Sequence, residues 1–316
     1  MSETTVVRRG RGGAPMSSGA DNARWFWPAG SRAQDGLDLV IDERVEGWAH
    51  TGLVVATLGP GEALTRDLGE WEAMVVPLSG GAAVQVDGHQ HTLTGRESVF
   101  AGPTDILYAP AGSVLTLTAS QGRGSRLAVC LARAKGSGGG EEDLPVAYLS
   151  GAQVPVELRG AGVASRQVRN FGVPGVLGAS RLIACEVVTP AGNWSSWPPH
   201  KHDTERPGRE SELEEIYYFE TRATDERGVD PVGYQRVYGT AERPIDVLAE
   251  VRSGDVVLVP HGWHGPAIAS PSSDLYYLNV MAGPGPQRAW LICDDPAHAW
   301  VRESWPDLPP DPRLTG

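Results

Sequence analysis

Short apolar runs broken by Gly, Pro and Asp recur along almost the whole chain, and they constrain its fold more than any other feature. Examples are "GLVVATL", "EAMVVPL" and "SVLTLTA" in the first half, and "RLIACEVVTP", "IDVLAEV" and "DVVLVP" in the second. No apolar repeat of 3.6 residues persists long enough to predict a substantial helix. Asp87-Gly88 in "VQVDGHQHTL" predicts a two-residue hairpin turn. The chain is therefore predicted to be all-β.

The β-rich sequence divides into two halves at the Gly-rich, charged stretch "RAKGSGGGEEDLP". We predict a disordered tail over 1–22, a first barrel over 23–135, a linker over 136–150 and a second barrel over 151–316. Met16 is an alternative start within that tail. The segments "DILYAPAGSVLTL" and "DVVLVPHGWHGPAIA" share a strand, a Pro, a Gly turn and a second strand, as in the second motif of cupins. This predicts a bicupin, with two tandem double-stranded β-helix (jelly-roll) barrels.

Charge and composition exclude several classes of partner. The 27 Lys and Arg against 39 Asp and Glu give a formal charge of −12, which disfavours nucleic acid because phosphate binding needs a basic face. A small acidic substrate needs only one local cation. No apolar run approaches the ~20 residues of a membrane helix, so no membrane association is expected. Three widely separated cysteines predict reduced thiols and a cytoplasmic location.

Histidines and a glutamate in the second half have the pattern of a metal site. In "WPPHKHD", His200 and His202 are two apart and point to one face of a strand, with Lys201 pointing away. "ESELEEIYYFE" then supplies a carboxylate, from Glu214 or Glu215, and "VPHGWHG" supplies His261 or His264 after a Gly turn. Such a set resembles the metal ligands of cupins, and it suits zinc, iron, manganese or nickel better than calcium.

Alternation along the strand favours Glu215 over Glu214, because Glu215 shares its face with Tyr217 and Phe219. His264 is favoured over His261 because it lies on the strand after the turn and can reach back into the barrel. The first half offers a comparison in "DGHQHTL", where the same His-x-His spacing has no paired Glu and no downstream His in that half. We expect that pair to be solvated and the first barrel to be structural.

The motifs "GNWSSWPPHKHD", "LEEIYYFE", "GYQRVYG", "VLVPHGWHG" and "YYLNVMAGP", in this order, resemble the 5-deoxy-glucuronate isomerase family of myo-inositol catabolism. That family is similar to the 5-keto-4-deoxyuronate isomerases, which are zinc bicupins. The resemblance implies an aldose–ketose isomerase that converts 5-deoxy-D-glucuronate to 2-deoxy-5-keto-D-gluconate. It implies His200, His202, Glu215 and His264 as the ligands of a divalent metal, with zinc expected and manganese or iron as alternatives. The twelve-residue spacer between His202 and Glu215 departs from generic cupins.

Further residues near the motifs are candidates for catalysis and substrate binding. A bound cation would polarise the substrate carbonyl, and one base would move the proton. The candidate catalytic residues are His261, Glu214 and Tyr217. The candidate substrate contacts are Arg236, Arg181 and Trp263.

Two other functions fit the same ligands. One is a metal-dependent cupin oxygenase, and the other is a related isomerase of the 5-keto-4-deoxyuronate type. In each case the expected partner is a small acidic sugar or a related small molecule. A homo-oligomer is compatible with the sequence.

Overall fold

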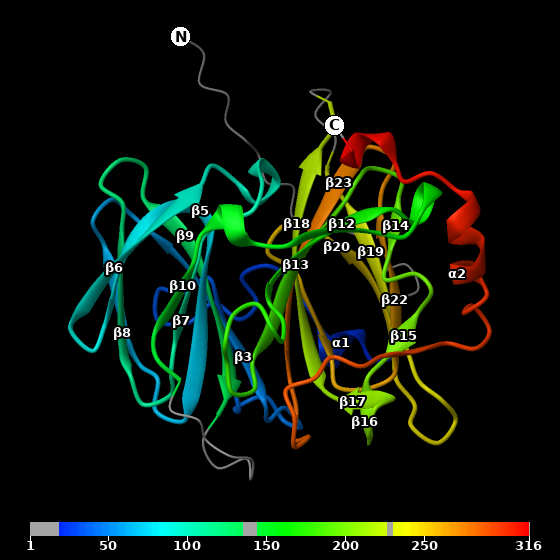
Figure 1. The fold of residues 1–316 in the computed structure, drawn as a ribbon, viewed down its shortest axis with the longest axis horizontal. Coiled ribbons are helices and arrows are strands. Elements are labelled where there is room, and N and C mark those ends of the chain that lie inside the picture. The colour runs from blue at the N-terminus through cyan, green and yellow to red at the C-terminus, as the bar shows by residue number, and fades with distance from the viewer. Residues whose placement is uncertain (1–18, 135–143, 226–229, 316) are drawn as a thin grey trace.

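The structure, a computed structural model, describes residues 19–134, 144–225 and 230–315. Strands account for about half of these residues and the helices are short, which confirms the all-β prediction. Figure 1 shows two β-barrels side by side, one from each half of the chain, and this is the predicted bicupin architecture. The helices are α1 (Asn22–Trp25) and α2 (Val301–Ser304), with 3-10 turns at Val99–Ala101, Gly151–Gln153, Gly162–Ala164, Trp305–Asp307 and Pro312–Leu314.

The first barrel is one bent nine-stranded sheet in which the long strand β5 pairs with β6, β7, β8 and β9. Asp87 and Gly88 both have positive φ, so the predicted hairpin turn joins β5 and β6. The strands are β2 (Leu39–Ile41), β3 (Thr51–Leu58), β4 (Ala63–Asp67), β5 (Trp71–Val86), β6 (His89–Arg96), β7 (Ile106–Ala109), β8 (Val114–Ala119), β9 (Ser125–Arg133) and β10 (Ala147–Leu149).

The second barrel is closed by a seven-stranded and a six-stranded sheet. The seven-stranded sheet contains, in spatial order, β1 (Phe26–Trp27), β21 (Val256–Val259), β18 (Glu214–Ala223), β23 (Ser273–Ala282), β13 (Ile183–Thr189), β12 (Arg166–Gly172) and β11 (Val156–Arg159). The six-stranded sheet contains β20 (Asp246–Val251), β19 (Gly233–Tyr238), β22 (Trp263–Ala269), β15 (His200–Lys201), β24 (Cys293–Asp294) and β14 (Trp194–Ser195). A separate ribbon pairs β16 (Asp203–Arg206) with β17 (Glu210–Glu212).

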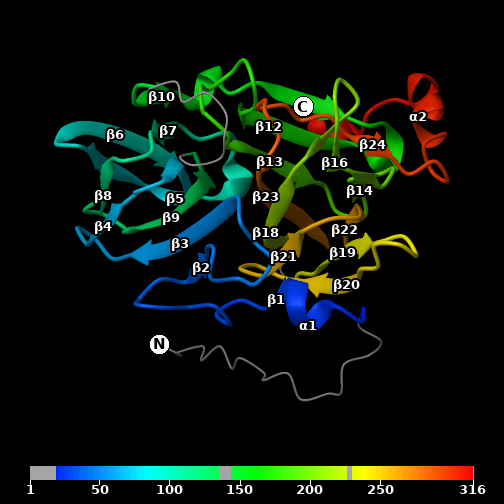
Figure 2. The same ribbon diagram turned by 90° about the horizontal axis from the view of Figure 1, so that it is seen from below.

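Two short strands cross between the halves, and this differs from the predicted boundaries. Strand β1 pairs with β21 of the second barrel, and Figure 2 shows α1 and β1 lying beside β20 and β21. Residues 19–22 are bound to β20, with the Ala20 N–H donating to Asp246 Oδ2 at 2.9 Å. Strand β10, within the predicted linker, pairs with β7 of the first barrel. The predicted tail over 1–18 and the linker residues 135–143 lie outside the described residues.

Strand β18 is buried on both faces because it separates the two barrels. One face lines the second barrel, and the other packs on β3 of the first. This explains why "LEEIYYFE" is rich in aromatic residues rather than alternating apolar and polar. The interface also contains a buried ionic cluster, in which Glu186 accepts from Tyr276 Oη at 2.6 Å and pairs with Arg96 and Arg169.

Two buried glutamates tie the barrels together in a reciprocal way. Glu72 on β5 accepts hydrogen bonds from the backbone N–H groups of residues 180–182, just before β13, at 2.6–2.7 Å. Glu214 on β18 accepts from the N–H groups of residues 49–51, at the start of β3, at 2.5–3.2 Å. Each barrel therefore supplies one carboxylate that holds the start of a strand in the other.

Candidate metal centre

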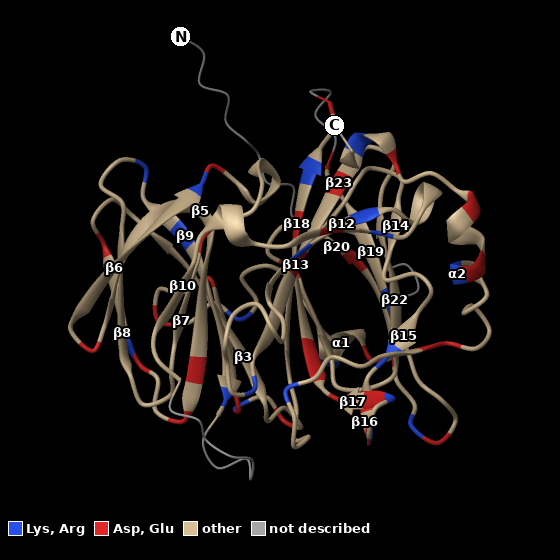
Figure 3. Cartoon of the chain, in the orientation of Figure 1, with Lys and Arg blue, Asp and Glu red and all other residues tan. Residues whose placement is uncertain are grey.

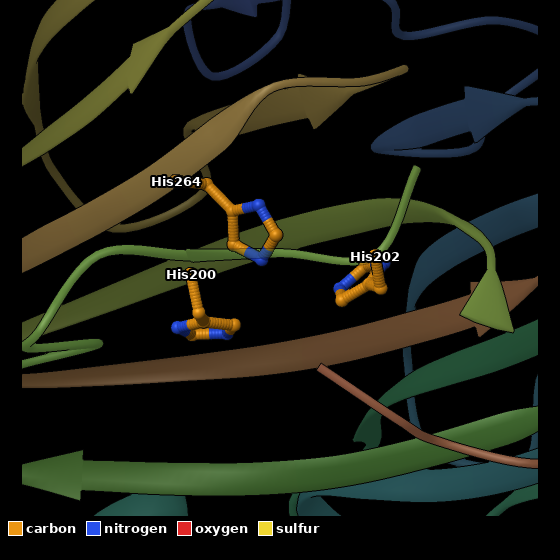
Figure 4. A group of neighbouring side chains, drawn as sticks. All are labelled: His200, His202 and His264. Atoms are coloured by element: carbon orange, nitrogen blue, oxygen red, sulfur yellow. The ribbon is translucent and has the colours of Figure 1, made fainter. Parts of the chain in front are cut away.

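Three histidine side chains of the second barrel point into one space, as Figure 4 shows. One ligand nitrogen from each of His200, His202 and His264 lies within 4.8 Å of the others, and all three side chains are buried. The ring of His264 lies 4.4 Å from that of His200 and 4.7 Å from that of His202, between centroids. The described residues therefore contain a buried cluster that can hold a divalent metal.

Local backbone structure brings these histidines together. His200 on β15 is directly opposite His264 on β22, so their side chains share one face of the sheet. His202 follows β15 and keeps the same orientation, with Lys201 between them half-buried. Gly262 sets the turn before His264, with φ of +92° and only 2.8 Å between a hypothetical Cβ and the Tyr238 carbonyl oxygen. A side chain there would be strained, so the "HGWH" turn requires its glycine.

Glu215 completes the cluster from the facing sheet. Its Oε2 lies 3.0 Å from His202 Nε2 and 3.1 Å from His264 Nε2, and the side chain is buried on β18. The four residues expected as ligands thus converge, although they lie on three different strands or their immediate continuations. A carboxylate together with imidazoles is a donor set that zinc, manganese and iron accept.

The hydrogen bonds of the rings show why a cation fits between them. The Nδ1 atoms of His202 and His264 lie 3.1 Å from the carbonyl oxygens of Leu213 and Gly262 respectively. A carbonyl only accepts, so each Nδ1 carries the hydrogen, and each neutral ring presents an Nε2 lone pair to the carboxylate. Lone pairs facing a carboxylate repel it unless a proton or a metal ion lies between them. His264 Nε2 is buried and makes no hydrogen bond despite its distance from Glu215.

Burial and neighbouring charge shift the pKa values of the cluster. Burial, followed by the charges of His264, His202 and Arg166, lowers the pKa of His200 well below its ordinary value. Burial alone would raise the pKa of Glu215, but the close contacts of its carboxylate with His202 and His264 outweigh burial and lower that pKa. Burial alone would lower the pKa of His202, but the hydrogen bond with Glu215 outweighs burial and raises that pKa. The cluster therefore presents an ionised carboxylate and, at His200, a neutral imidazole, the forms in which these groups bind metals.

Hydroxyl groups lie next to the cluster. The ring of Tyr217 is 6.1 Å from that of His264, and Tyr217 Oη is 3.3 Å from Ser196 Oγ. Tyr277 Oη lies 2.9 Å from Ser195 Oγ and 3.3 Å from Ser196 Oγ. Burial raises the pKa of Tyr217 well above its ordinary value, which keeps its hydroxyl protonated at neutral pH. Of the three candidate catalytic residues, Tyr217 is the one that the structure brings to the cluster.

The structure does not bring Glu214 or His261 into contact with the cluster. Glu214 points to the opposite face of β18 from Glu215, where its carboxylate binds residues 49–51. Period-two alternation is the physical reason, since neighbouring strand residues face opposite sides. His261 is half-exposed, and burial and the charge of Arg243 lower its pKa. Within the described ranges it makes no hydrogen bond or ring contact with the three histidines.

The candidate substrate contacts also lie elsewhere. Arg236 pairs with Asp246 and donates to the Val237 and Val247 carbonyls, on the outer side of β19. Arg181 donates through Nη1 to the Gly285 carbonyl, and its own N–H donates to Glu72. Trp263 alternates with His264 on β22 and so faces the other way, with Lys201 Nζ 5.5 Å from its ring centroid.

Sequence reasoning missed two polar residues whose side chains are buried in this half. Gln235, the neighbour of Arg236, is 0% exposed, and neither amide atom has a partner among the described residues. It lies on the inner face of β19, opposite Ala267, as Val237 lies opposite His264. Arg166, on β12, is buried and has one hydrogen bond. Strand alternation in "GYQRVYG" could have indicated that Gln235 points inward with Val237. No local feature of the sequence indicated that Arg166 is buried.

Comparison with known proteins agrees with this geometry. The profile of the KduI/IolB family matches residues 26–301. The chain belongs to the KduI/IolB family. Similar relatives are the 5-deoxy-glucuronate isomerase of Geobacillus kaustophilus, 39% identical over 89% of this chain and 96% of its own length, and that of Bacillus subtilis strain 168, 36% identical over 79% and 86%.

Solved structures extend the comparison of this KduI/IolB family member. An IolB-like protein from Salmonella typhimurium superposes with a TM-score of 0.77 at 34% identity, covering 88% of this chain and 99% of its own. A mutant of Bacillus subtilis oxalate decarboxylase superposes with a TM-score of 0.57 at 12% identity, covering 90% of this chain and 88% of its own. The second likeness shows a shared fold alone.

The expectations about nucleic acid and membrane partners concern the surface charge and the helices. In Figure 3, Lys and Arg are interspersed with Asp and Glu over both barrels. No helix among the described residues combines the length and apolar character needed to cross a bilayer.

Proposed function

We propose that this chain is a divalent-metal-dependent 5-deoxy-glucuronate isomerase, which converts 5-deoxy-D-glucuronate to 2-deoxy-5-keto-D-gluconate. The relatives at 34–39% identity that carry this name support the activity. The observation that best supports a metal is that the Nε2 atoms of His202 and His264 both face the Glu215 carboxylate. Such an arrangement of acceptors is repulsive unless a proton or a metal ion lies between them, and a divalent cation can satisfy both rings and the carboxylate at once.

In this proposal His200, His202, Glu215 and His264 hold the ion, with zinc expected and manganese or iron as alternatives. A divalent cation there supplies Lewis-acid polarisation of a substrate carbonyl. The protein supplies the remaining functions. The Leu213 and Gly262 carbonyls fix the ring orientation of His202 and His264. The Tyr217 hydroxyl donates a hydrogen bond to a substrate oxygen, and the buried surroundings exclude water.

The same proposal assigns the chain a metabolic context. Its substrate is a small acidic sugar, and its reaction is a step of myo-inositol catabolism in the cytoplasm. Isomerisation needs no oxygen, which distinguishes it from an oxygenase with the same ligand set.

The test is an NMR assay of purified protein with 5-deoxy-D-glucuronate under anaerobic conditions, run beside elemental analysis. We expect turnover and about one equivalent of divalent metal per chain. His264→Ala should lose both metal and turnover. His89→Ala is the matched control, because His89 belongs to the other His-x-His pair and is exposed next to the β5–β6 turn. Turnover that requires oxygen, or equal metal loss in both variants, contradicts the proposal.

A further inference from the structure

Arg166 differs from the other buried arginines of the chain. Its side chain, on β12, is 5% exposed, yet among the described residues no carboxylate lies within 4.0 Å of its guanidinium. Its hydrogen bond goes from Nη1 to the Ala164 carbonyl at 3.0 Å, and no side chain or backbone group of the described residues accepts from Nε or Nη2. A buried arginine normally has a charged partner or a full set of acceptors, because desolvation of its charge is costly.

Two other arginines of the second half show how such side chains are satisfied in this protein. Arg159, directly opposite Arg166 in the β11–β12 register, donates from Nε and Nη2 to the two carboxylate oxygens of Glu157 at 3.0 and 2.7 Å. Arg288 lacks a carboxylate, but its Nε, Nη1 and Nη2 each donate to a backbone carbonyl, at 2.6–2.9 Å. Arg166 has neither arrangement. The Nε and Nη2 groups of Arg166 are therefore available to an acceptor that is not part of the described chain.

The local charge balance favours an anion. Arg159 and Arg302 are close enough to affect the ionisation of Arg166, but Glu157 neutralises the first and Asp294 the second. Three arginines and two carboxylates leave one positive charge. Burial, together with the other two arginines, lowers the pKa of Arg166 to about 10, so the guanidinium remains charged at neutral pH. One negative group in this position would balance the cluster.

A second donor without a partner lies beside Arg166. The Cζ of Arg166 is 5.7 Å from the ring centroid of Trp305, and the Nε1–H of Trp305 is buried with no hydrogen-bond partner among the described residues. A guanidinium and an indole N–H are donors only. A ligand that satisfies both must be an acceptor, and a carboxylate accepts two parallel bonds from an arginine.

Arg166 belongs to the barrel that holds the metal centre. It is two residues before Val168, so both face the same side of β12, and the register continues from Val168 through Val187 to Tyr277. Tyr277 lies 5.0 Å from Tyr217 between ring centroids, and Tyr217 lies next to His264. The guanidinium also contributes to the lowered pKa of His200. Arg166 thus lies within electrostatic reach of the histidines without contacting them.

We propose that Arg166, with the indole of Trp305, forms the subsite that binds the carboxylate of an acidic sugar whose carbonyl end lies at the histidine cluster. The proposal rests on the isomerase function and adds its determinant of acid specificity. The chain of a uronic acid separates its carbonyl from its carboxylate, which agrees with an arginine near the metal centre but outside it. The buried Gln235 amide and Asn279 Nδ2, also without partners, are available for the hydroxyl groups between them.

The probe for this subsite is D-glucuronate, compared with its neutral amide D-glucuronamide, by calorimetric titration of the metal-loaded protein. The wild type should bind the acid at least ten-fold more tightly than the amide. Arg166→Gln should lose roughly 10- to 100-fold in affinity for the acid, the value of a charge-assisted pair, with little change for the amide. Arg166→Lys keeps the charge and should retain part of the preference. Trp305→Phe keeps the ring and should weaken acid binding a few-fold.

Arg236→Gln is the matched control, because Arg236 is the arginine of the same half that the sequence favoured and it already pairs with Asp246. It should bind both probes as the wild type does, and every variant should keep its bound metal. Equal affinity of the wild type for acid and amide overturns the proposal, as does an unchanged preference in Arg166→Gln or, if that variant does not fold, in Arg166→Lys. Loss of the preference in Arg236→Gln also overturns it. If 5-deoxy-glucuronate is not turned over but acid binding still depends on Arg166, the isomerase function fails and the subsite stands.

Discussion

Glu214 and Glu215 are adjacent in sequence, and exchanging each for glutamine should have different effects: the first on stability and the second on metal binding. Glu215 faces the histidines, with Oε2 at 3.0 and 3.1 Å from two Nε2 atoms. Glu214 faces the first barrel. Its Oε1 accepts from His50 N, Thr51 N and Thr51 Oγ1 at 2.6, 2.5 and 3.0 Å, and its Oε2 accepts from Ala49 N at 3.2 Å.

The size of the Glu214→Gln effect follows from these contacts. Four hydrogen bonds to a charged acceptor, at about 1.5–3 kcal/mol each, would give roughly 6–12 kcal/mol. Burial of the carboxylate offsets several kcal/mol of this, and it is also the main reason that the pKa of Glu214 is raised. Glutamine keeps one oxygen acceptor but turns an NH2 group toward an N–H donor. We expect a net loss of about 2–4 kcal/mol, or roughly 3–6 °C in Tm for a chain of this size.

Differential scanning calorimetry and metal analysis of the two variants separate the roles. Glu214→Gln should lower Tm by that amount and keep its metal. Glu215→Gln should lose metal affinity by 10-fold or more, because a charged ligand becomes a weak neutral one. A Glu214→Gln protein with wild-type Tm and reduced metal content would refute the assignment of the two faces of β18.

Three further changes have measurable outcomes. Burial alone would raise the pKa of Glu186, but the charge of Arg96 outweighs burial and lowers that pKa. The ion pair therefore stabilises the fold fully above the unfolded-state pKa near 4.3, and this stabilisation is lost as the pH falls through the lower pKa of the folded state. Glu186→Gln should reduce the slope of Tm against pH below about pH 5. Gln235→Leu should leave Tm unchanged or slightly raised, since it removes an unsatisfied buried amide, while raising KM for the acidic sugar several-fold in steady-state kinetics. Asp203 Oδ2 accepts from Gly262 N at 2.9 Å, so Asp203→Asn should loosen the turn before the last histidine and weaken metal binding about 10-fold in a chelator competition.

Local periodicity predicted that these four side chains face one another because each of them is marked by its own strand. The two-residue spacing of His200 and His202 fixed their common face, and alternation on β18 separated Glu215 from Glu214. Burial would not have separated the two glutamates, because both are buried on a strand that is covered on both sides. The position of Tyr217 beside His264 follows from the same alternation.

The residues proposed to contact the substrate were harder to predict, because the candidates were selected by their charge and not by the direction of their side chains. Arg236 was favoured as the cation on a motif strand, but alternation places it outside and puts its neutral neighbour Gln235 inside. Arg166 and Trp305 are 139 positions apart by residue number and meet only through tertiary packing. The crossing strands β1 and β10 have two and three residues, too few for any periodic signal.

Comparing the barrels shows that the fold and the metal site depend on different residues. Glu72 and Glu214 occupy matching places, opposite Ala132 and Ala282 on the strands β9 and β23, and make the same kind of clamp. The next residue is Ala73 in the first barrel and Glu215 in the second. After the matching turns, whose Gly112 and Gly262 both have positive φ, Val114 is exposed where His264 is buried. The scaffold contacts are thus present in both barrels, whereas a carboxylate and an inward histidine occur in one. Introducing a glutamate at position 73 alone would bury a charge with no partner, so it should destabilise the first barrel rather than create a second metal site.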